Sequence, residues 1–101
     1  MASVSMSTLS PKAEKLLRLL YKHYLDRRND GMPKSEAFSI GNADYICENI
    51  CSLYNVVMPD RDIDGASDEL CGYELIFKNH FGYIALQEEF LNFCIDNHIK
   101  V

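Results

Sequence analysis

The spacing of the apolar residues changes after Gly72, and that change limits the possible folds most strongly. Before Gly72, apolar residues recur every three or four positions, which is typical of amphipathic helices. After it, the segments YELIF (73–77) and FGYIAL (81–86) are rich in aromatic and branched residues, and polar residues 78–80 separate them. This pattern predicts a hairpin of two short strands. The sequence therefore predicts an α+β fold that is mostly helical.

The first predicted helix covers residues 11–29 and has clear signals at both ends. Ser10 suits the N-cap, Pro11 suits the first helical position, and Gly31 suits the residue just after the end. Three more helices are expected at 43–54, 60–71 and 87–97. The chain leaves two alternatives open for residues 34–41: a short extended piece, or a single helical turn.

The length and the cysteine pattern restrict the domain organisation and the compartment. A chain of 101 residues has room for one core, expected within residues 10–101, after a small, Ser-rich and flexible tail at 1–9. We find neither an export signal nor an apolar run that could span a bilayer, so we expect a cytoplasmic protein without membrane contact. The cysteines lie in periodic segments and are expected as free thiols; they are Cys47, Cys51, Cys71 and Cys94.

The order of helices, hairpin and last helix resembles the winged helix-turn-helix superfamily, especially its small uncharacterised members in bacteria and their phages. The residues that carry the resemblance are the turn Asp30-Gly31-Met32-Pro33 after the first helix, the segment reaching Ile40-Gly41, and the passage from Leu70 through Gly72-Tyr73. The resemblance implies a winged-helix-like domain of three helices, a β-hairpin wing and a C-terminal helix. It also implies that the third helix enters the major groove of DNA and that the hairpin contacts the backbone or minor groove.

The charge distribution argues against this way of binding DNA. The net charge is −5, and residues 51–101 hold three Lys/Arg against nine Asp/Glu. The third predicted helix carries one arginine and five carboxylates, which would repel phosphates. These carboxylates instead predict a surface for a basic protein partner; they are Asp60, Asp62, Asp64, Asp68 and Glu69.

Two functional hypotheses follow from these observations. The preferred one is a non-catalytic protein-interaction module, a small accessory or regulatory protein, including an inhibitor that mimics the charge of nucleic acid. The alternative is a DNA-binding transcriptional regulator that uses the basic turn after the first helix and the hairpin. It requires its cations to converge on one face, and its candidate contacts are Arg27, Arg28, Lys34, Lys78 and Asn79.

The apolar faces of the first and last predicted helices are wider than one core stripe needs. A second copy of the chain could cover this surface as a homodimer. A fold that wraps its own core with both faces explains the same pattern equally well. The residues of this candidate dimer surface are Tyr21, Leu25, Phe90, Leu91, Phe93 and Ile95.

The residues that could carry chemistry do not form a known motif. Cys47 and Cys51 lack the second close-spaced pair typical of structural zinc sites. The run Asp60–Gly65 resembles the start of a calcium loop, but its twelfth position is Cys71, where such a loop needs a glutamate. We therefore expect no catalytic residue, no metal and no cofactor, and we do not expect an enzyme.

Overall fold

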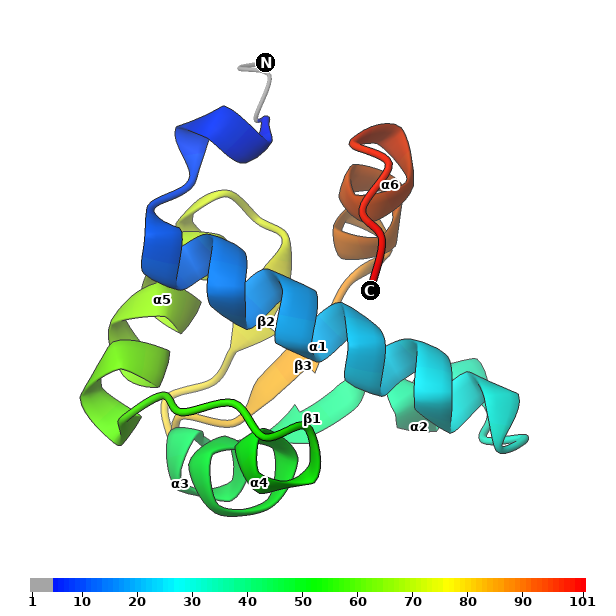
Figure 1. Ribbon diagram of the computed structural model, residues 1–101, viewed down its shortest axis with the longest axis horizontal. Helices are drawn as coiled ribbons and strands as arrows, with labels where there is room; N and C mark the ends of the chain where they lie inside the picture. Colours follow the sequence, from blue (N-terminus) through cyan, green and yellow to red (C-terminus); the bar gives the residue numbers. More distant parts are fainter. Residues whose placement is uncertain (1–4) are drawn as a thin grey trace.

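The computed structural model describes residues 5–101 (Figure 1). The helical elements are a 3₁₀ turn η1 (Met6–Thr8), α1 (Pro11–Asn29), α2 (Lys34–Ala37), α3 (Ala43–Tyr45), the π-helical segment η2 (Ile46–Ile50), α4 (Cys51–Leu53), α5 (Asp60–Gly72) and α6 (Glu88–Asp96). The strands are β1 (Ser39–Gly41), β2 (Ile76–Lys78) and β3 (Ile84–Leu86). The predicted α+β class with a high helix content is confirmed.

Helix α1 has the predicted bounds, and its local chemistry explains them. The Ser10 hydroxyl accepts a hydrogen bond from the Ala13 amide at 3.2 Å, and Pro11 fills the first position. At the other end, Gly31 adopts φ +91°, and the Met32 amide donates to the Arg27 carbonyl at 3.1 Å. This is the hydrogen-bond pattern of a helix ended by a left-handed residue.

The same type of ending recurs after α4, α5 and α6, where the left-handed residue is not glycine. Asn55, Glu74 and His98 have φ of 55°, 63° and 54°. In each case the next amide donates to a carbonyl five residues back, as Leu75 does to Leu70 at 3.1 Å. Helix α5 was predicted at 60–71 with Gly72 as its stop, but Gly72 lies inside the helix and Glu74 makes the reversal.

The helical run α3–η2–α4 covers residues 43–53 and confirms the predicted helix at 43–54. The Asn42 side chain caps it by accepting a hydrogen bond from the Tyr45 amide at 2.9 Å. The last helix, α6, was predicted at 87–97 and is one residue shorter at each end. Both alternatives for residues 34–41 hold in part, because the helical turn α2 is followed directly by strand β1.

The three strands form an antiparallel sheet in the order β1-β3-β2. Strand β2 pairs with β3 through Ile76 opposite Leu86 and Lys78 opposite Ile84. The hairpin is confirmed, but its strands are shorter than the predicted 73–77 and 81–86. Tyr73 and Glu74 are used in the turn that ends α5, and residues 79–83 form a loop. In this loop the Asn79 side-chain oxygen accepts hydrogen bonds from the Phe81 and Tyr83 amides, at 2.9 and 3.0 Å.

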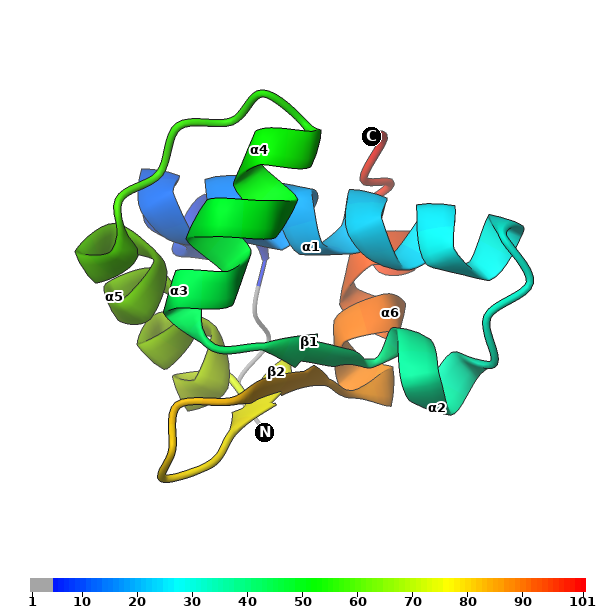
Figure 2. The same ribbon diagram turned by 90° about the horizontal axis from the view of Figure 1, so that it is seen from below.

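The core lies between the helices and one face of the sheet (Figure 2). Its fully buried side chains come from α1, η2, α5, β2 and α6, and they include Leu16, Leu20, Ile50, Ile63, Leu70, Ile76 and Phe90. No helix within residues 5–101 covers the opposite face of the sheet, where Phe77 is exposed. The predicted tail at 1–9 lies partly outside the described residues. In its described part, Leu9 is buried in the core, so the folded region begins before the predicted boundary at residue 10.

Gly41, at the end of β1, occupies a position that a side chain cannot enter without strain. Its φ is +132°, and a Cβ atom there would lie 2.9 Å from the Tyr45 ring. We expect Gly41→Ala to lower the free energy of unfolding by about 1–3 kcal/mol. Urea denaturation followed by circular dichroism measures this.

Gly65→Ala is the matched control for that substitution. Gly65 lies inside α5 with an ordinary helical backbone and open space around it. Alanine should stabilise the helix there by about 0.5–1 kcal/mol. Equal effects of the two substitutions would contradict the close contact between Gly41 and Tyr45.

Candidate functional site

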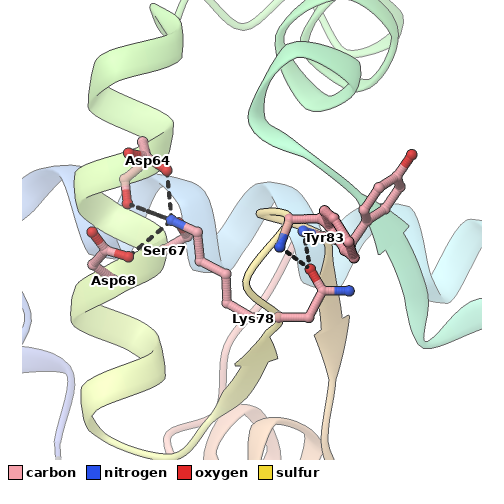
Figure 3. A network of polar contacts seen from close by, with 7 residues as sticks. Asp64, Ser67, Asp68, Lys78 and Tyr83 are labelled. Atoms are coloured by element: carbon pink, nitrogen blue, oxygen red, sulfur yellow. Dashed lines mark hydrogen bonds and ion pairs between the residues drawn. The ribbon is translucent and has the colours of Figure 1, made fainter.

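Two of the five residues predicted to form the acidic surface, Asp64 and Asp68, form ion pairs with Lys78 of strand β2 (Figure 3). The Lys78 ammonium lies 2.5 Å from an Asp64 carboxylate oxygen, 2.8 Å from an Asp68 oxygen and 3.1 Å from the Ser67 hydroxyl. Partial burial opposes the charge on Lys78, but the bonds to Asp64 and Asp68 outweigh it, so the pKa of Lys78 is raised. This cluster ties the hairpin to α5.

The other carboxylates of α5 also have partners within the chain. Asp62 forms an ion pair with Lys12 at 3.0 Å, and a Glu69 oxygen accepts a hydrogen bond from the Ser10 amide at 2.8 Å. Both contacts join α5 to the first turn of α1. The predicted acidic surface on α5 is therefore partly neutralised, and much of its charge serves to hold helices and hairpin together.

Asp60 differs from these four, because it lies beside another carboxylate. Its side chain lies within interaction range of Asp44 of α3 and of the Cys47 thiol. The contact raises the pKa of Asp44 and lowers that of Asp60, since one shared proton favours one acid over the other. The Asp60 carboxylate also raises the pKa of the Cys47 thiol, which disfavours the reactive thiolate.

Asp44 borders a groove of about 440 Å³ between the edge of the sheet and the α3–η2 helix. Residues of β1, of the α3–η2 helix and Tyr83 from the hairpin loop line it. In Figure 3 the Tyr83 ring points away from the Lys78 cluster and toward β1. We call this feature the acidic groove; its lining residues are Ser39, Ile40, Gly41, Asn42, Asp44, Tyr45, Glu48, Asn49 and Tyr83.

A second hollow of about 210 Å³ continues past Asp44 toward the tip of the hairpin loop. It shares Asn42 and Asp44 with the acidic groove and adds Asp64 and Phe81. Three aromatic side chains on these two hollows are exposed: Tyr45 to 46%, Tyr83 to 55% and Phe81 to 72%. Among the described residues, no lysine or arginine lines either hollow. Clustered exposed aromatic rings are typical of binding surfaces.

The cations predicted to contact DNA do not converge. Lys78 lies at α5, whereas Arg27 lies near the far end of α1 and Lys34 lies on α2, at the opposite side of the molecule (Figure 1). Arg27 donates to the Ser39 carbonyl at 2.7 Å, and Arg28 donates to the Met32 carbonyl at 2.8 Å. Lys34 pairs with Glu88, and the Asn79 side chain is used inside the hairpin loop. The DNA-binding alternative requires these cations to lie on one face, and they do not.

The predicted dimer surface is wrong in two of its six members. Phe90 and Phe93 are buried in the core of the single chain, so they cannot face a second copy. Tyr21, Leu25 and Leu91 are partly buried against that core, with the Tyr21 ring 6.3 Å from the Phe90 ring. Only Ile95 of this set is largely exposed. The wide apolar faces of α1 and α6 thus mostly wrap the chain's own core.

The residues considered for metal binding lie in ordinary packing positions. Cys51 and Cys94 are buried, Cys47 and Cys71 are partly buried, and all four are free thiols, as predicted. Within residues 5–101, no three His, Cys, Asp or Glu side chains gather as a metal site would require. The described helices also include none with the length and apolar character needed to cross a bilayer.

Comparison with known proteins adds no relative: no protein family, curated protein or solved structure matches this chain.

The Lys78 cluster leads to a prediction about stability. The Lys78 side chain is 14% exposed and holds two carboxylates, whereas Lys12 is 64% exposed and holds one. We expect Lys78→Met to lower the free energy of unfolding by about 1–2 kcal/mol, with solvent around the two carboxylates reducing the loss. Thermal and urea denaturation measure the change.

Lys12→Met serves as the control, with an expected loss of about 0–1 kcal/mol because an exposed ion pair contributes little. If both variants lost the same stability, the Lys78 cluster would be no more than another surface ion pair.

Proposed function

We propose that this chain is a non-catalytic protein-interaction module that binds a Lys/Arg-rich segment of a partner protein in the acidic groove. The observation that carries the proposal is the combination of carboxylates that form no ion pair with exposed aromatic rings, around a groove that no described lysine or arginine lines. Asp44 and Glu48 supply the charge, and Tyr45 and Tyr83 supply the rings. A guanidinium or ammonium gains both from a carboxylate and from the face of an aromatic ring.

The geometry favours an extended basic peptide over a single small cation. The acidic groove and the second hollow meet at Asn42 and Asp44, so side chains of successive residues could enter both. One of the lining elements is β1, an edge strand of the sheet, since β3 pairs with it on one side only. An edge strand offers main-chain groups that can bind an extended partner segment, although Arg27 already donates to the Ser39 carbonyl of β1.

The scaffold proposed for this module is winged-helix-like. Three observations support it: the order of α1, the α3–α4 run and α5, the hairpin that follows, and the antiparallel pairing of β1 with that hairpin. Under this proposal α5 corresponds to the helix that reads DNA, and its outward residues Asp60, Asp64 and Asp68 oppose that role. A negative face of this kind fits an accessory protein that binds a basic protein, including one whose nucleic-acid site it would block. Four free thiols fit a cytoplasmic setting.

The proposal is tested with a short labelled Arg/Lys-rich peptide, titrated with the protein and followed by fluorescence anisotropy. We expect saturable binding. Asp44→Asn combined with Glu48→Gln should weaken it roughly two- to thirtyfold, because two exposed charge contacts are lost. Tyr83→Ala should weaken it roughly two- to fivefold, the size expected for one exposed cation–π contact.

The matched control is Glu36→Gln combined with Glu89→Gln, which removes the same charge from exposed positions outside the groove. It should leave the affinity within about twofold, since distant exposed charges are screened by salt. Equal weakening by both pairs would mean that net charge alone attracts the peptide. A labelled mixed-sequence DNA duplex should not bind, even at low salt. Tight, steeply salt-dependent DNA binding would overturn the proposal.

A further inference from the structure

A second groove, of about 360 Å³, lies along α1 and has the opposite charge from the acidic groove. Three separate parts of the chain form it: one face of α1, the segment after α4, and the last residues. Figure 2 shows the end of α4 and the C-terminus on the same side of α1. We call it the basic groove; its lining residues are Lys15, Arg18, Leu19, Lys22, Tyr54, Val56, Lys100 and Val101. It shares no residue with the acidic groove.

The four cations of this groove differ in their partners: Arg18 and Lys22 each pair with one exposed carboxylate, and Lys15 and Lys100 pair with none among the described residues. Lys15 donates to the Val57 carbonyl at 2.8 Å, and Arg18 donates to the Lys100 carbonyl at 3.4 Å. Among the described residues, neither Lys15 nor Lys100 has a carboxylate partner. The main-chain oxygens orient Lys15 and Arg18 without adding a negative charge. Four cations converge here although the chain carries a net charge of −5.

The two side-chain carboxylates beside the groove compensate this charge weakly. Glu14 lies 3.7 Å from Arg18, and Asp26 lies 3.4 Å from Lys22. Both pairs link successive turns of α1 and are exposed to solvent, where such contacts contribute little. An anion of higher charge density would therefore compete well for these cations.

The floor between the cations is apolar. Leu19 is buried, Val56 is partly buried, and the Tyr54 ring lies 5.7 Å from the Lys22 ammonium. The Tyr54 hydroxyl points to Asp26 and donates a hydrogen bond to it at 2.7 Å. Burial and this bond raise the pKa of Tyr54, so the ring stays neutral and presents an apolar surface.

We propose that the basic groove binds a small amphiphilic anion, a carboxylate or phosphate ester on an aliphatic or aromatic body. The cations hold the head group, and the floor of Leu19, Tyr54 and Val56 holds the body. The volume falls in the range of small-molecule sites, and the site combines an apolar surface with a few convergent polar groups, as such sites do. This activity is separate from binding a basic partner in the acidic groove, so either can fail without the other.

The probe for the test is anilinonaphthalene sulfonate, an amphiphilic anion whose fluorescence rises in apolar surroundings. We expect saturable binding to the folded protein, with amide shifts at Leu19 and Val56 in nuclear magnetic resonance spectra. Lys15→Glu should weaken binding about tenfold or more, because it turns an attraction at close range into a repulsion. Lys100→Glu gives the second variant and should act in the same direction.

Arg61→Glu on α5 changes the net charge by the same amount as Lys15→Glu, at an exposed position outside the groove. It should alter the affinity less than about twofold, since distant exposed charges are screened. The uncharged parent anilinonaphthalene should bind far more weakly than the sulfonate. Octanoate or octyl phosphate should displace the probe, and the stronger competitor shows which head group the site prefers.

Four results would overturn the proposal: equal binding of the uncharged parent, equal weakening by Arg61→Glu, displacement by neither octanoate nor octyl phosphate, or amide shifts at Tyr45 and Tyr83 in place of Leu19 and Val56.

Discussion

The buried face of α1 is the constraint on which the rest of this structure depends. Leu16, Leu17 and Leu20 are fully buried, and α5, the sheet and α6 all contribute side chains to the core that covers them. In a chain of 101 residues, a helix of 19 residues that buries one whole face leaves the other elements few ways to pack. The Ser10–Glu69 and Lys12–Asp62 contacts then join the beginning of α1 to α5.

The same helix also separates the two kinds of charge. Its buried face fills the core, while Lys15, Arg18 and Lys22 lie on the outward face and line the basic groove. Five of the nine carboxylates in the second half of the chain lie on α5 instead, and Asp44 and Glu48 lie on the α3–η2 helix. A chain with an excess of five negative charges thus has one groove without cations and another with four. This separation lets one small domain present two surfaces for ligands of opposite charge.

The sequence predicted the elements well and their contacts poorly, for a physical reason. Helix bounds depend on local groups, such as Ser10 at the N-cap and Asn42 before α3, which can be seen in the sequence itself. Strand β1 could not be separated from a helical turn, because its pairing partner Ala85 lies far along the chain. The end of α5 was misplaced because Glu74, rather than a glycine, takes the left-handed position.

The candidate sites were even harder to predict, because they depend on contacts between residues far apart in the sequence. The carboxylates on α5 were visible as a charge cluster, but no local signal shows that Lys78 neutralises two of them. Tyr45 and Tyr83 are far apart in sequence, and only the pairing of β1 with β3 brings them to one groove. The basic groove has no local signal in the sequence, because its residues come from α1, from Tyr54 and Val56 after α4, and from the last two residues.

Asp64 links the stability of the hairpin to the candidate binding surface. Its carboxylate holds Lys78, and the same residue lines the hollow that continues the acidic groove. A guanidinium or ammonium from a partner would therefore share Asp64 with Lys78. Asp68 and Ser67 still hold the Lys78 ammonium, so the hairpin does not need Asp64 alone. Under the proposed function, this redundancy would let the Asp64 carboxylate turn toward a partner while the hairpin keeps Tyr83 and Phe81 in place.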